Sequence, residues 1–459
     1  MFDWRNWDRV TQVYNEVHNK MTNITPSNTQ KRAIDAIKHW YQNDTEKQQI
    51  FRMFGYAGVG KSTVLKFALE ELGLETHKAG KGGDDCTPGV VIATFTGKAA
   101  LVLRRKGTMA RTIHSLIYSV IESTEEEVNE FAEKIAKAQN DLRALFGEER
   151  YAAEAGVVAM RKQLAAMKMP SYALNPSSDA AECKLIVLDE VSMVDERMAA
   201  DLMSFGKPIL VLGDPGQLPP IRGQGAFTQA QPDVMLTEIH RQAQESPIIR
   251  LATMAREGAW IPYGQYDGHV AKMHKRDLST AHLLKADQVI CGKNATRLQL
   301  NNDMRMCSGF SPDAIPTGNG EKIICLKNQN DIGLINGMFL TLEDIADEDE
   351  RFFSAVVTDD EGDLVGKPRK NKPPRLKIYK GHFLDHAAFD PERHDKDWQV
   401  KKLLTEATFG WAITCHKAQG SAFNNVIVWD DGLGQTPLDR ARWLYTAITR
   451  AEQGLVILA

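Results

Sequence analysis

The sequence predicts an α/β protein built on parallel sheets, and three observations support this fold class. Short apolar runs typical of buried strands recur along the chain, at 50–54, 90–94, 184–188, 209–212 and 289–291. Segments with helical spacing of apolar side chains separate these runs. Polar clusters follow directly after the runs, as expected for parallel sheets, whose ligands lie at the carboxyl ends of the strands. The 459 residues are enough for two to four domains.

The composition is that of an ordinary globular protein, with 43% hydrophobic and 25% charged residues. The net charge is −4, so any surface that binds nucleic acid is expected to be a local channel rather than a basic domain. The six cysteines form no C-x-x-C pair or His–Cys cluster, which predicts a reducing compartment without a disulfide framework or zinc site. We expect no membrane span and no signal peptide, and a location in the cytoplasm of a bacterium or of a phage-infected cell.

Two helices are expected before the first strand. Residues 4–21 place apolar side chains on one helix face, which is expected to pack on the following domain. Thr25 to Asn28 is typical of a helix start, and the second helix is expected to continue to about Tyr41. Gln30 lies in its first turn and is a candidate for reading the edge of an adenine through its paired donor and acceptor.

The segment from Gly55 to Thr63 reads G-x-x-x-x-G-K-[ST], which is typical of a phosphate-binding loop. An apolar run precedes it and a helical pattern follows at 64–72, the context that such a loop requires. Lys61 is expected to reach the β- and γ-phosphates, and the Ser62 hydroxyl is expected to bind Mg²⁺. The loop and the following helix N-terminus therefore predict a nucleotide site. Its expected residues are Gly55, Ala57, Gly58, Val59, Gly60, Lys61, Ser62 and Thr63.

Residues 119–169 predict an antiparallel αα-hairpin, because apolar residues keep helical spacing on both sides of Gly147. Ser123 and Glu126 suit a capping box at its start. Its expected role is that of a structural arm. Residues 170–179 are expected to form a polar connector back to the α/β unit.

Two neighbouring carboxylates, Asp189 and Glu190, follow a buried strand. Phosphoryl transfer to water needs one carboxylate to hold Mg²⁺ and a second to orient or deprotonate the water. We assign the first role to Asp189. Gln217 follows the next strand and is a candidate for sensing the γ-phosphate or positioning the water. A turn residue without a catalytic role is the alternative for Gln217.

Arg241 and Arg450 are the candidates for stabilising negative charge in the transition state, a role that arginine often fills in phosphoryl transfer. A structural salt bridge is the alternative for each. Arg450 belongs to a second α/β unit. If it reaches the phosphates, the nucleotide lies between two domains and hydrolysis must move them.

That second unit is expected to begin at Val289, with a helix over 294–306, and its pattern resumes at Thr414. The intervening residues 338–400 are rich in Pro, Lys and Asp and contain short β-like segments. They predict a small inserted β module.

Eight motifs, in this order, resemble those of the superfamily 1 DNA helicases and are most similar to the RecD/Dda-like branch: GYAGVGKST, ATFTGKAA, RTIHSLI, LIVLDEVSM, VLGDPGQLPP, LTEIHRQ, TCHKAQG and YTAITRAE. The resemblance covers nearly all of residues 25–459. It implies two RecA-like P-loop domains with parallel sheets, a helical 1B insertion and a small SH3-like 2B insertion. The implied boundaries are 1A at 1–118 and 181–250, 1B at 119–180, 2A at 251–337 and 401–459, and 2B at 338–400.

The resemblance further implies an ATP- and Mg²⁺-dependent DNA helicase that moves 5′-to-3′ on single-stranded DNA in replication, recombination or repair. It carries Gln30 to the adenine position and Gly420 to the nucleotide site. The implied partners are single-stranded DNA and junctions of single-stranded with duplex DNA, together with single-strand-binding or replisome proteins. A monomer without membrane contact is expected. The implied DNA contacts, for which helix capping is the alternative, are Thr96, Lys98, Thr112, His114, Asn294, Thr414 and His416.

The 1B interval departs from the family pattern, which commonly carries a short β-hairpin pin there. Either the pin is rebuilt as helices, or it is reduced to residues 169–179, where Tyr172 and Leu174 are the bulky side chains. Two alternatives to a helicase follow. One is a translocase that strips proteins from single strands without efficient unwinding, and the other is a motor subunit or loading factor of a larger complex. RNA as the substrate also stays open.

Overall fold

The computed structural model describes residues 25–75, 89–105, 107–121, 123–167, 171–220, 225–238, 245–311, 315–329, 332–347, 349–367, 372–384 and 403–459. The helix expected at 4–21, the loop after the first α/β helix and Arg241 lie outside these residues. Within the described ranges, no helix is both long enough and apolar enough to cross a membrane.

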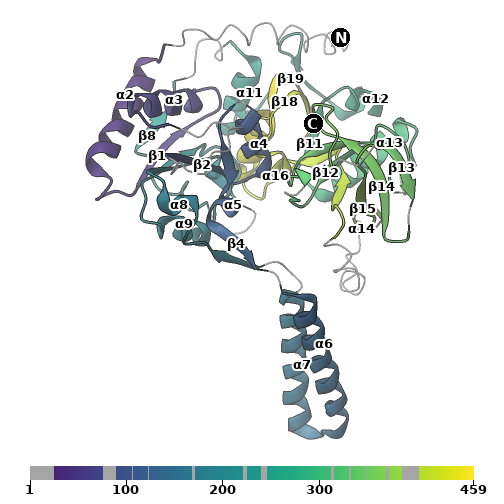
Figure 1. The fold of residues 1–459 in the computed structure, drawn as a ribbon. Helices are drawn as coiled ribbons and strands as arrows, with labels where there is room; N and C mark the ends of the chain where they lie inside the picture. Colours follow the sequence, from purple (N-terminus) through teal and green to yellow (C-terminus); the bar gives the residue numbers. More distant parts are fainter. Residues whose placement is uncertain are drawn as a thin grey trace.

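The first α/β unit is a six-stranded sheet in the order β3-β2-β6-β7-β1-β8. Figure 1 labels its strands β1, β2 and β8. Each pair of neighbouring strands is parallel, as predicted. The carboxyl ends of all these strands therefore lie at one edge of the sheet. The strands are β1 (Ile50–Gly55), β2 (Val90–Thr94), β3 (Ala110–Thr112), β6 (Leu185–Asp189), β7 (Ile209–Gly213) and β8 (Val234–Leu236).

Helices cover both faces of this sheet, which explains why its strands are nearly continuous apolar runs. Leu210 and Leu212 of β7 belong to the core on one face, and Ile209 and Val211 belong to the core on the other. The first face is covered by α2 (Asn28–His39), α3 (Lys61–Glu71) and α4 (Gly97–Arg105), and the second by α5 (Ile113–Ile117), α8 (Asp179–Glu182) and α9 (Glu196–Met203).

The second α/β unit repeats this architecture with a six-stranded sheet in the order β17-β11-β18-β19-β10-β9. Its pairs are parallel except for the edge strand β9. Helices α11 (Pro247–Arg256) and α17 (Pro437–Ile448) cover one face, and α12 (Thr280–Leu283) and α13 (Asn294–Cys307) cover the other. The strands are β9 (Gly264–Gln265), β10 (Val270–Met273), β11 (Gln288–Cys291), β17 (Ala412–Thr414), β18 (Phe423–Trp429) and β19 (Ala451–Leu458).

The predicted β module is a five-stranded antiparallel sheet in the order β15-β14-β13-β12-β16. This sheet extends beyond residues 338–400, because β12 and β16 pair through Ile323 and Phe409 on either side of that interval. The strands are β12 (Lys322–Cys325), β13 (Phe339–Asp347), β14 (Phe352–Thr358), β15 (Leu376–Tyr379) and β16 (Ala407–Phe409).

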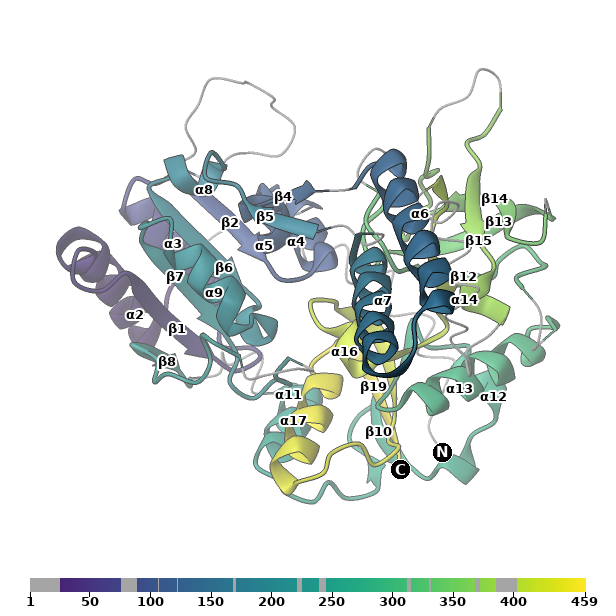
Figure 2. The same ribbon diagram turned by 90° about the horizontal axis from the view of Figure 1, so that it is seen from below.

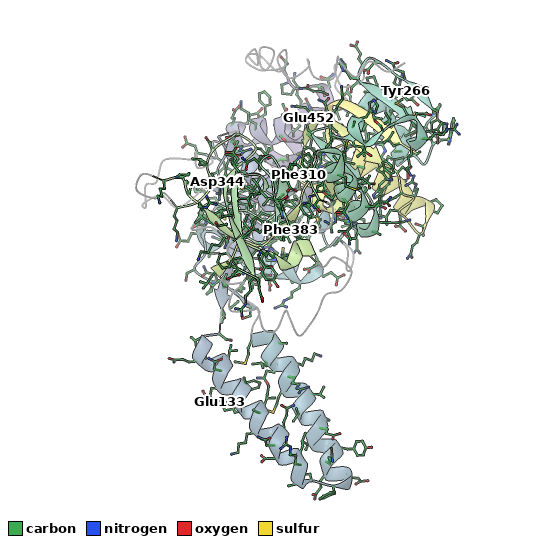
Figure 3. All side chains as sticks on the ribbon, turned by 90° about the vertical axis from the view of Figure 1, so that its right-hand side faces the viewer. Glu133, Tyr266, Phe310, Asp344, Phe383 and Glu452 are labelled. Carbon is green, nitrogen blue, oxygen red and sulfur yellow. The ribbon has the colours of Figure 1, made fainter. Side chains whose placement is uncertain are left out.

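The predicted αα-hairpin forms and extends away from the body of the molecule, as the position of Glu133 illustrates (Figures 1 and 3). Its helices α6 (Glu125–Asp141) and α7 (Gly147–Met167) lie side by side, which is also visible from below (Figure 2). We call this hairpin the arm.

Two predictions about the arm were wrong in detail. The capping box is made by Thr124 and Glu127, not by Ser123 and Glu126. Both pairs fit the same spacing, and Thr124 is the residue whose backbone is extended before the helix begins.

The expected polar connector contains a strand. Its β5 (Ser171–Leu174) pairs with β4 (Tyr118–Ile121) to form a two-stranded antiparallel ribbon at the base of the arm. Polar residues after β5 hid this strand, whose existence depends on a partner about 50 positions earlier in the chain.

The arm makes a testable prediction about stability. Its buried side chains Val128, Ile135 and Val157 belong to none of the five hydrophobic clusters found in the described parts of the body. Replacing residues 122–170 by an Asn-Gly turn between Ile121 and Ser171 should therefore shift the thermal unfolding midpoint of the body by less than about 4 °C. Circular dichroism melting measures this shift, and loss of cooperative unfolding would contradict the prediction.

Candidate nucleotide site and nucleic-acid cleft

The phosphate loop connects β1 to α3. Gly58 and Gly60 have φ angles of 80° and 81°, a left-handed backbone that glycine adopts without steric cost. Lys61 Nζ donates hydrogen bonds to the carbonyl oxygens of Gly55 at 2.7 Å and Tyr56 at 3.4 Å. Helix α3 begins at Lys61, so the first N–H groups of the helix have no acceptor within it. This arrangement offers several donors to an anion.

Ser62 and Asp189 line one cavity of about 850 Å³ next to α3. A hydroxyl and a carboxylate are hard oxygen ligands, so this pair fits Mg²⁺. Glu190 follows with φ 56° and ψ 48°, a left-handed backbone that costs a residue with a side chain about 1–2 kcal/mol. Such strain occurs preferentially at functional sites, and here it lies directly after the proposed metal ligand.

The loop after β7 lies between these carboxylates and the phosphate loop, because β7 separates β6 from β1 in the sheet. Asp214 in this loop is 5% exposed and accepts hydrogen bonds from Gly216 N at 2.9 Å and the Tyr445 hydroxyl at 2.6 Å. Burial raises the pKa of the Asp214 carboxyl, while the charge of Lys61 and both hydrogen bonds lower it. Gln217 Oε1 is buried and has no hydrogen-bond partner among the described residues, so it is an acceptor suited to a water molecule.

Gln30 connects α2 to the phosphate loop. Its Oε1 accepts from Ser27 N at 3.0 Å, and its Nε2 donates to the Val59 carbonyl oxygen at 3.0 Å. Glu238, at the end of β8, accepts a 2.5 Å hydrogen bond from the Thr29 hydroxyl. These bonds fix the start of α2 beside the phosphate loop.

The second unit contacts the phosphate loop through Tyr445, whose hydroxyl accepts a 2.9 Å hydrogen bond from Ala57 N. Arg450, one turn further along the chain, donates to the Thr446 and Ser421 carbonyl oxygens and to the Thr449 hydroxyl. These partners all belong to the second unit. A contact of Arg450 with the phosphates therefore stays a prediction.

Sequence reasoning missed Tyr445, Asp214 and Arg256 as members of this site. The Arg256 guanidinium lies 3.5 Å from the centre of the Tyr56 ring and so reaches the phosphate loop from α11. Tyr445 and Asp214 lie inside two of the quoted motifs, but a tyrosine within an apolar helix pattern is predicted to be a residue of the hydrophobic core. Only the contact between the two units reveals its polar role.

The structure places Gly420 against α4 of the first unit. A Cβ atom at this position would lie 2.4 Å from Thr96 Oγ1 and 3.1 Å from Ala99 Cβ. The close approach joins the two units next to Thr96. The nucleotide contact expected of Gly420 stays a prediction.

The residues expected to contact DNA line one cleft of about 510 Å³ that both units share. The first unit contributes Thr96, Lys98, Thr112 and His114, and the second contributes Asn294, Thr414 and His416.

Neutral polar groups dominate this cleft. Burial lowers the pKa of His114 and of His416, so both imidazoles are uncharged at pH 7. Thr96 and Thr112 accept hydrogen bonds from backbone N–H groups in the first turns of α4 and α5, so both also cap helices. Hydroxyl and amide groups of this kind suit contacts to a phosphate backbone, which fix register without reading sequence.

Aromatic rings that sequence reasoning did not assign to base stacking form one wall of the cleft. Phe95 and Tyr172 line it, and their ring centres lie 6.1 and 5.8 Å from that of His114. Tyr172 comes from β5, so the ribbon at the base of the arm contributes to the cleft. Aromatic faces of this kind can stack nucleobases of any sequence.

Lys98, like Lys417, is an exception to the neutral lining. Its ammonium nitrogen lies 4.1 Å from the ring centre of Phe339, 4.9 Å from that of Phe423 and 3.6 Å from Asp360 Oδ2. Burial lowers the pKa of Lys98 to about 8, although Asp360 opposes this effect. Lys98 therefore joins α4 to the β module in addition to lining the cleft.

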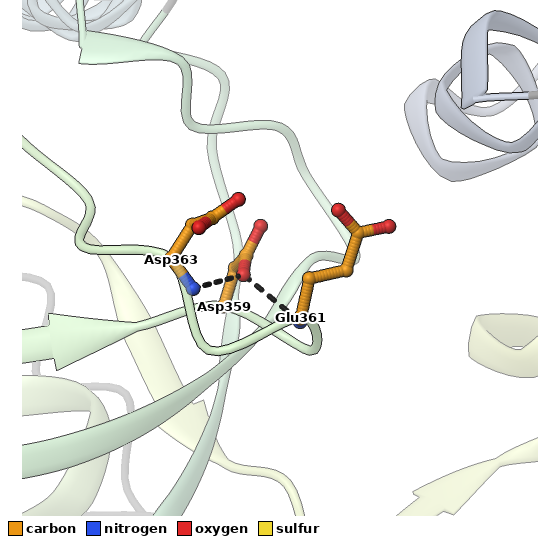
Figure 4. A group of neighbouring side chains, drawn as sticks. All are labelled: Asp359, Glu361 and Asp363. Atoms are coloured by element: carbon orange, nitrogen blue, oxygen red, sulfur yellow. Dashed lines mark hydrogen bonds between the residues drawn. The ribbon is translucent and has the colours of Figure 1, made fainter.

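The turn after β14 carries three carboxylates, on Asp359, Glu361 and Asp363, whose oxygens lie within 4.8 Å of one another (Figure 4). Asp359 Oδ1 accepts hydrogen bonds from the backbone N atoms of Glu361 and Asp363 at 2.9 and 3.0 Å. Arg105 of α4 pairs with Asp359 at 3.3 Å and with Glu361 at 2.9 Å. The guanidinium supplies the positive charge, so this turn is a point of attachment between α4 and the β module.

The strain at Glu190 predicts unequal stabilities for two variants that both lack its carboxylate. Glycine adopts the left-handed backbone freely and alanine does not, while glycine loses more chain entropy on folding. Glu190→Gly should therefore unfold with a free energy about 0.5–1 kcal/mol higher than that of Glu190→Ala, as measured by urea denaturation. Equal stabilities would show that the backbone at this position carries no strain.

The buried ammonium of Lys98 predicts a loss of folding stability that depends on pH. With a pKa near 8 in the folded state, against the ordinary value of 10.5, the unfolded chain binds more protons between pH 8 and 10.5. The contribution of Lys98 to stability therefore rises with pH in this window. Lys98→Met should stabilise the protein by roughly 2 kcal/mol at pH 7, and this gain should shrink towards pH 10.5.

Lys66→Met is the matched control for this measurement, because Lys66 lies on the surface of α3 with a 75% exposed side chain. Its effect on the free energy of unfolding should be small at every pH. A Lys98→Met variant less stable than the wild type at pH 7 would contradict the prediction.

Comparison with known proteins agrees with this geometry. The chain is 27% identical over 252 residues to the ATP-dependent DNA helicase dda of Enterobacteria phage T4, covering 52% of this chain and 44% of that protein. It is 36% identical over 80 residues to the ATP-dependent RecD2 DNA helicase of Deinococcus radiodurans, covering 16% of this chain and 11% of that one. The chain thus spans less than half the length of the curated relatives it matches.

Among solved structures, the Pif1 helicase from Bacteroides in complex with ADP-AlF3 and ssDNA is 17% identical, with a TM-score of 0.47, and the match covers 95% of this chain and 93% of that one. Residues 409–458 match the UvrD-like helicase C-terminal domain. Residues 27–269, more than half of the chain, match the family described as AAA domain. The chain therefore belongs to the AAA domain family, and its resemblance to the superfamily 1 helicases of the RecD/Dda-like branch is confirmed.

Proposed function

We propose that this chain is an ATP-dependent DNA helicase that translocates 5′-to-3′ on single-stranded DNA and separates duplex, in replication, recombination or repair. One observation carries the proposal. The second unit contacts the phosphate loop through Tyr445 and lines the cleft through Asn294, Thr414 and His416. A change at the nucleotide site can therefore move one wall of the cleft. The direction of movement rests on the family resemblance.

The nucleotide site supports hydrolysis of ATP by this chain's own groups. Lys61 exchanges its loop carbonyls for the β- and γ-phosphates, and Glu190 takes a proton from the attacking water that Gln217 orients. Ser62 and Asp189 are the residues that would hold Mg²⁺, which would neutralise charge on the phosphates. Arg241 and Arg450 are proposed to stabilise the charge of the transition state from outside the phosphate loop.

The cleft supports binding of single-stranded DNA through its phosphates and base faces. Hydroxyl and amide groups from both units line the same cleft, and Phe95 and Tyr172 line it beside them. We assign bases to these rings and phosphates to the polar groups. The two units would close around ATP and reopen after hydrolysis. The two walls of the cleft would then hold the DNA strand in turn, and the protein would advance along it.

The ribbon of β4 and β5 supports strand separation and so favours a helicase over a translocase without unwinding activity. It presents exposed apolar side chains, namely Val120, Ile121, Tyr172 and Leu174, which are 57%, 54%, 48% and 37% exposed. Tyr172 among them lines the cleft. An apolar wedge can keep separated bases from pairing again, which matters because stacking averages about 1.4 kcal/mol per base-pair step. We therefore assign the role of the pin to this ribbon, with the arm in place of its turn.

The arm supports the second alternative, action with a partner. Its tip carries Phe146 and Tyr151, which are 79% and 77% exposed. Single-strand-binding and replisome proteins are the proposed partners of a motor that otherwise acts as a monomer. The scattered cysteines favour the reducing cytoplasm as its location.

Paired assays of duplex unwinding and of streptavidin displacement from single strands separate the helicase from the translocase.

The proposed function predicts the behaviour of Lys61→Ala. Because Lys61 is expected to contact the phosphates but not DNA, the variant should lose DNA-stimulated ATP hydrolysis by at least about 10³-fold. Its affinity for a single-stranded oligonucleotide without nucleotide should stay within about twofold of wild type. Colorimetric phosphate release and fluorescence anisotropy measure the two quantities.

Lys134→Ala is the matched control for Lys61→Ala. Lys134 lies on α6 of the arm, outside the nucleotide site, and it forms an exposed ion pair with Glu130. This variant should hydrolyse ATP like the wild type. ATP hydrolysis that persists in Lys61→Ala would overturn the assignment of the nucleotide site.

A further inference from the structure

Tyr445 makes the polar contact between the second unit and both loops of the nucleotide site. Its hydroxyl accepts a hydrogen bond from Ala57 N at 2.9 Å and donates one to Asp214 Oδ2 at 2.6 Å. Tyr445 is 1% exposed and Asp214 is 5% exposed, so water does not compete for the bond between them. Ala57 is half-buried. The hydroxyl therefore joins the phosphate loop and the loop that carries Gln217 to one side chain of α17.

The surrounding contacts hold this hydroxyl in place. A Cβ atom at Gly216 would lie 2.8 Å from the Tyr445 ring, so the loop fits against the ring only because residue 216 is glycine. The next residue, Thr446, accepts a hydrogen bond from Leu218 N at 2.9 Å. Gln419 donates to the Leu218 carbonyl oxygen at 3.0 Å. The second unit therefore contacts the loop after β7 at three residues, namely Asp214, Gly216 and Leu218.

The chemistry of the pair fixes the direction of the bond. Burial raises the pKa of the Tyr445 hydroxyl, so the phenol keeps its proton and is the donor. Asp214 is then the acceptor, and its other oxygen accepts from Gly216 N. Removing the phenolic oxygen would leave Asp214 short of one donor in a buried place, and Ala57 N without its acceptor in a half-buried one.

The elements around Tyr445 lead to the cleft. Helix α17 packs against α16 (Cys415–Ala418), and Cys415 Sγ donates to the Trp443 carbonyl oxygen of α17 at 3.7 Å. Thr414 precedes α16 and His416 lies within it, and both side chains line the cleft. A displacement of α17 at Tyr445 is thus passed through one helix contact to the residues proposed to bind DNA.

We propose that Tyr445 is a positioning residue that couples the phosphate loop to the cleft, so that bound nucleotide changes the affinity for single-stranded DNA through its hydroxyl. This inference rests on the proposed function. Nucleotide that moves the Ala57 backbone moves the donor of the hydrogen bond to the Tyr445 hydroxyl, and α17 follows. By linkage, single-stranded DNA changes the affinity for nucleotide by the same factor.

Tyr445→Phe tests this inference, because phenylalanine keeps the ring against Gly216 and removes only the hydroxyl. The dissociation constant of a fluorescein-labelled oligothymidylate is measured by anisotropy, with and without a non-hydrolysable ATP analogue and Mg²⁺. The variant should bind the oligonucleotide alone within about twofold of wild type. The ratio of the two constants should fall towards one, from the factor of about 5–150 typical of coupled sites.

Tyr266→Phe is the matched control. Its hydroxyl also makes a 2.6 Å hydrogen bond in the second unit, to the Pro262 carbonyl oxygen, away from both loops. This variant should keep the wild-type ratio. If Tyr445→Phe proves unfolded at the assay temperature, Asp214→Asn weakens the same bond at nearly equal volume and should also reduce the ratio.

Three results would overturn the inference. A Tyr445→Phe variant with the wild-type ratio would show that the hydroxyl does not carry the coupling. A wild-type protein that binds both ligands with a ratio of one would show that no coupling exists, while the proposed function stands. A wild-type protein that binds neither DNA nor nucleotide would overturn the proposed function itself.

Discussion

The order of parallel strands in the first sheet is the constraint on which the rest of this structure depends. All six strands end at one edge, and β6 lies in the middle of the order with β7 and β1 on one side and β2 and β3 on the other. The phosphate loop and Gln217 follow β1 and β7, and Asp189 is the last residue of β6. On the other side, Thr96 follows β2 and Thr112 is the last residue of β3. A single edge thus holds the nucleotide site and half of the cleft. The backbone hydrogen bonds of the sheet fix the spacing between them.

The second α/β unit closes over this edge through contacts that exclude water. Tyr56 and Ala57 of the phosphate loop pack against its hydrophobic core, which also includes Leu218 of the first unit. A buried interface tolerates polar groups only if they are paired, and Tyr445 meets this condition for Ala57 N and Asp214. Gln217 Oε1 is the group left without a described partner, and it lies in the loop that the second unit holds. A site assembled from two units in this way can respond to their relative movement.

The lining of the cleft carries little charge, and ion pairs attach α4 of the first unit to the β module. The lining is mostly neutral, which agrees with the net charge of −4 and with binding that is local and independent of sequence. Lys98, one of the two lysines that line the cleft, lies near Asp360 and two aromatic rings, and Arg105 pairs with the same turn. Helix α4 is therefore held to the β module at both of its ends. Movement of the cleft walls must strain or rearrange these ion pairs.

Much of the architecture was predictable, because it depends on local pattern. Continuous apolar runs predicted the buried parallel strands, the spacing of glycines and Lys61 predicted the phosphate loop, and helical spacing predicted both helices of the arm. The exceptions have a common cause. Strand β5, the strands β12 and β16 of the β module and the wall formed by Tyr172 depend on pairing with residues far away in the chain, which local pattern does not contain.

The same distinction applies to the site. The sequence by itself determined which chemical groups follow which strands, since motif spacing and strand periodicity are properties of neighbouring residues. The motifs identified the phosphate loop, and their family resemblance implied seven of the residues that line the cleft. Only the tertiary structure decided which of them meet: it brought Tyr445 to Ala57 and Asp214, held Arg450 within its own unit and placed Gly420 against Thr96. These contacts join residues up to 388 positions apart, and their geometry follows from the packing of two sheets rather than from either segment alone.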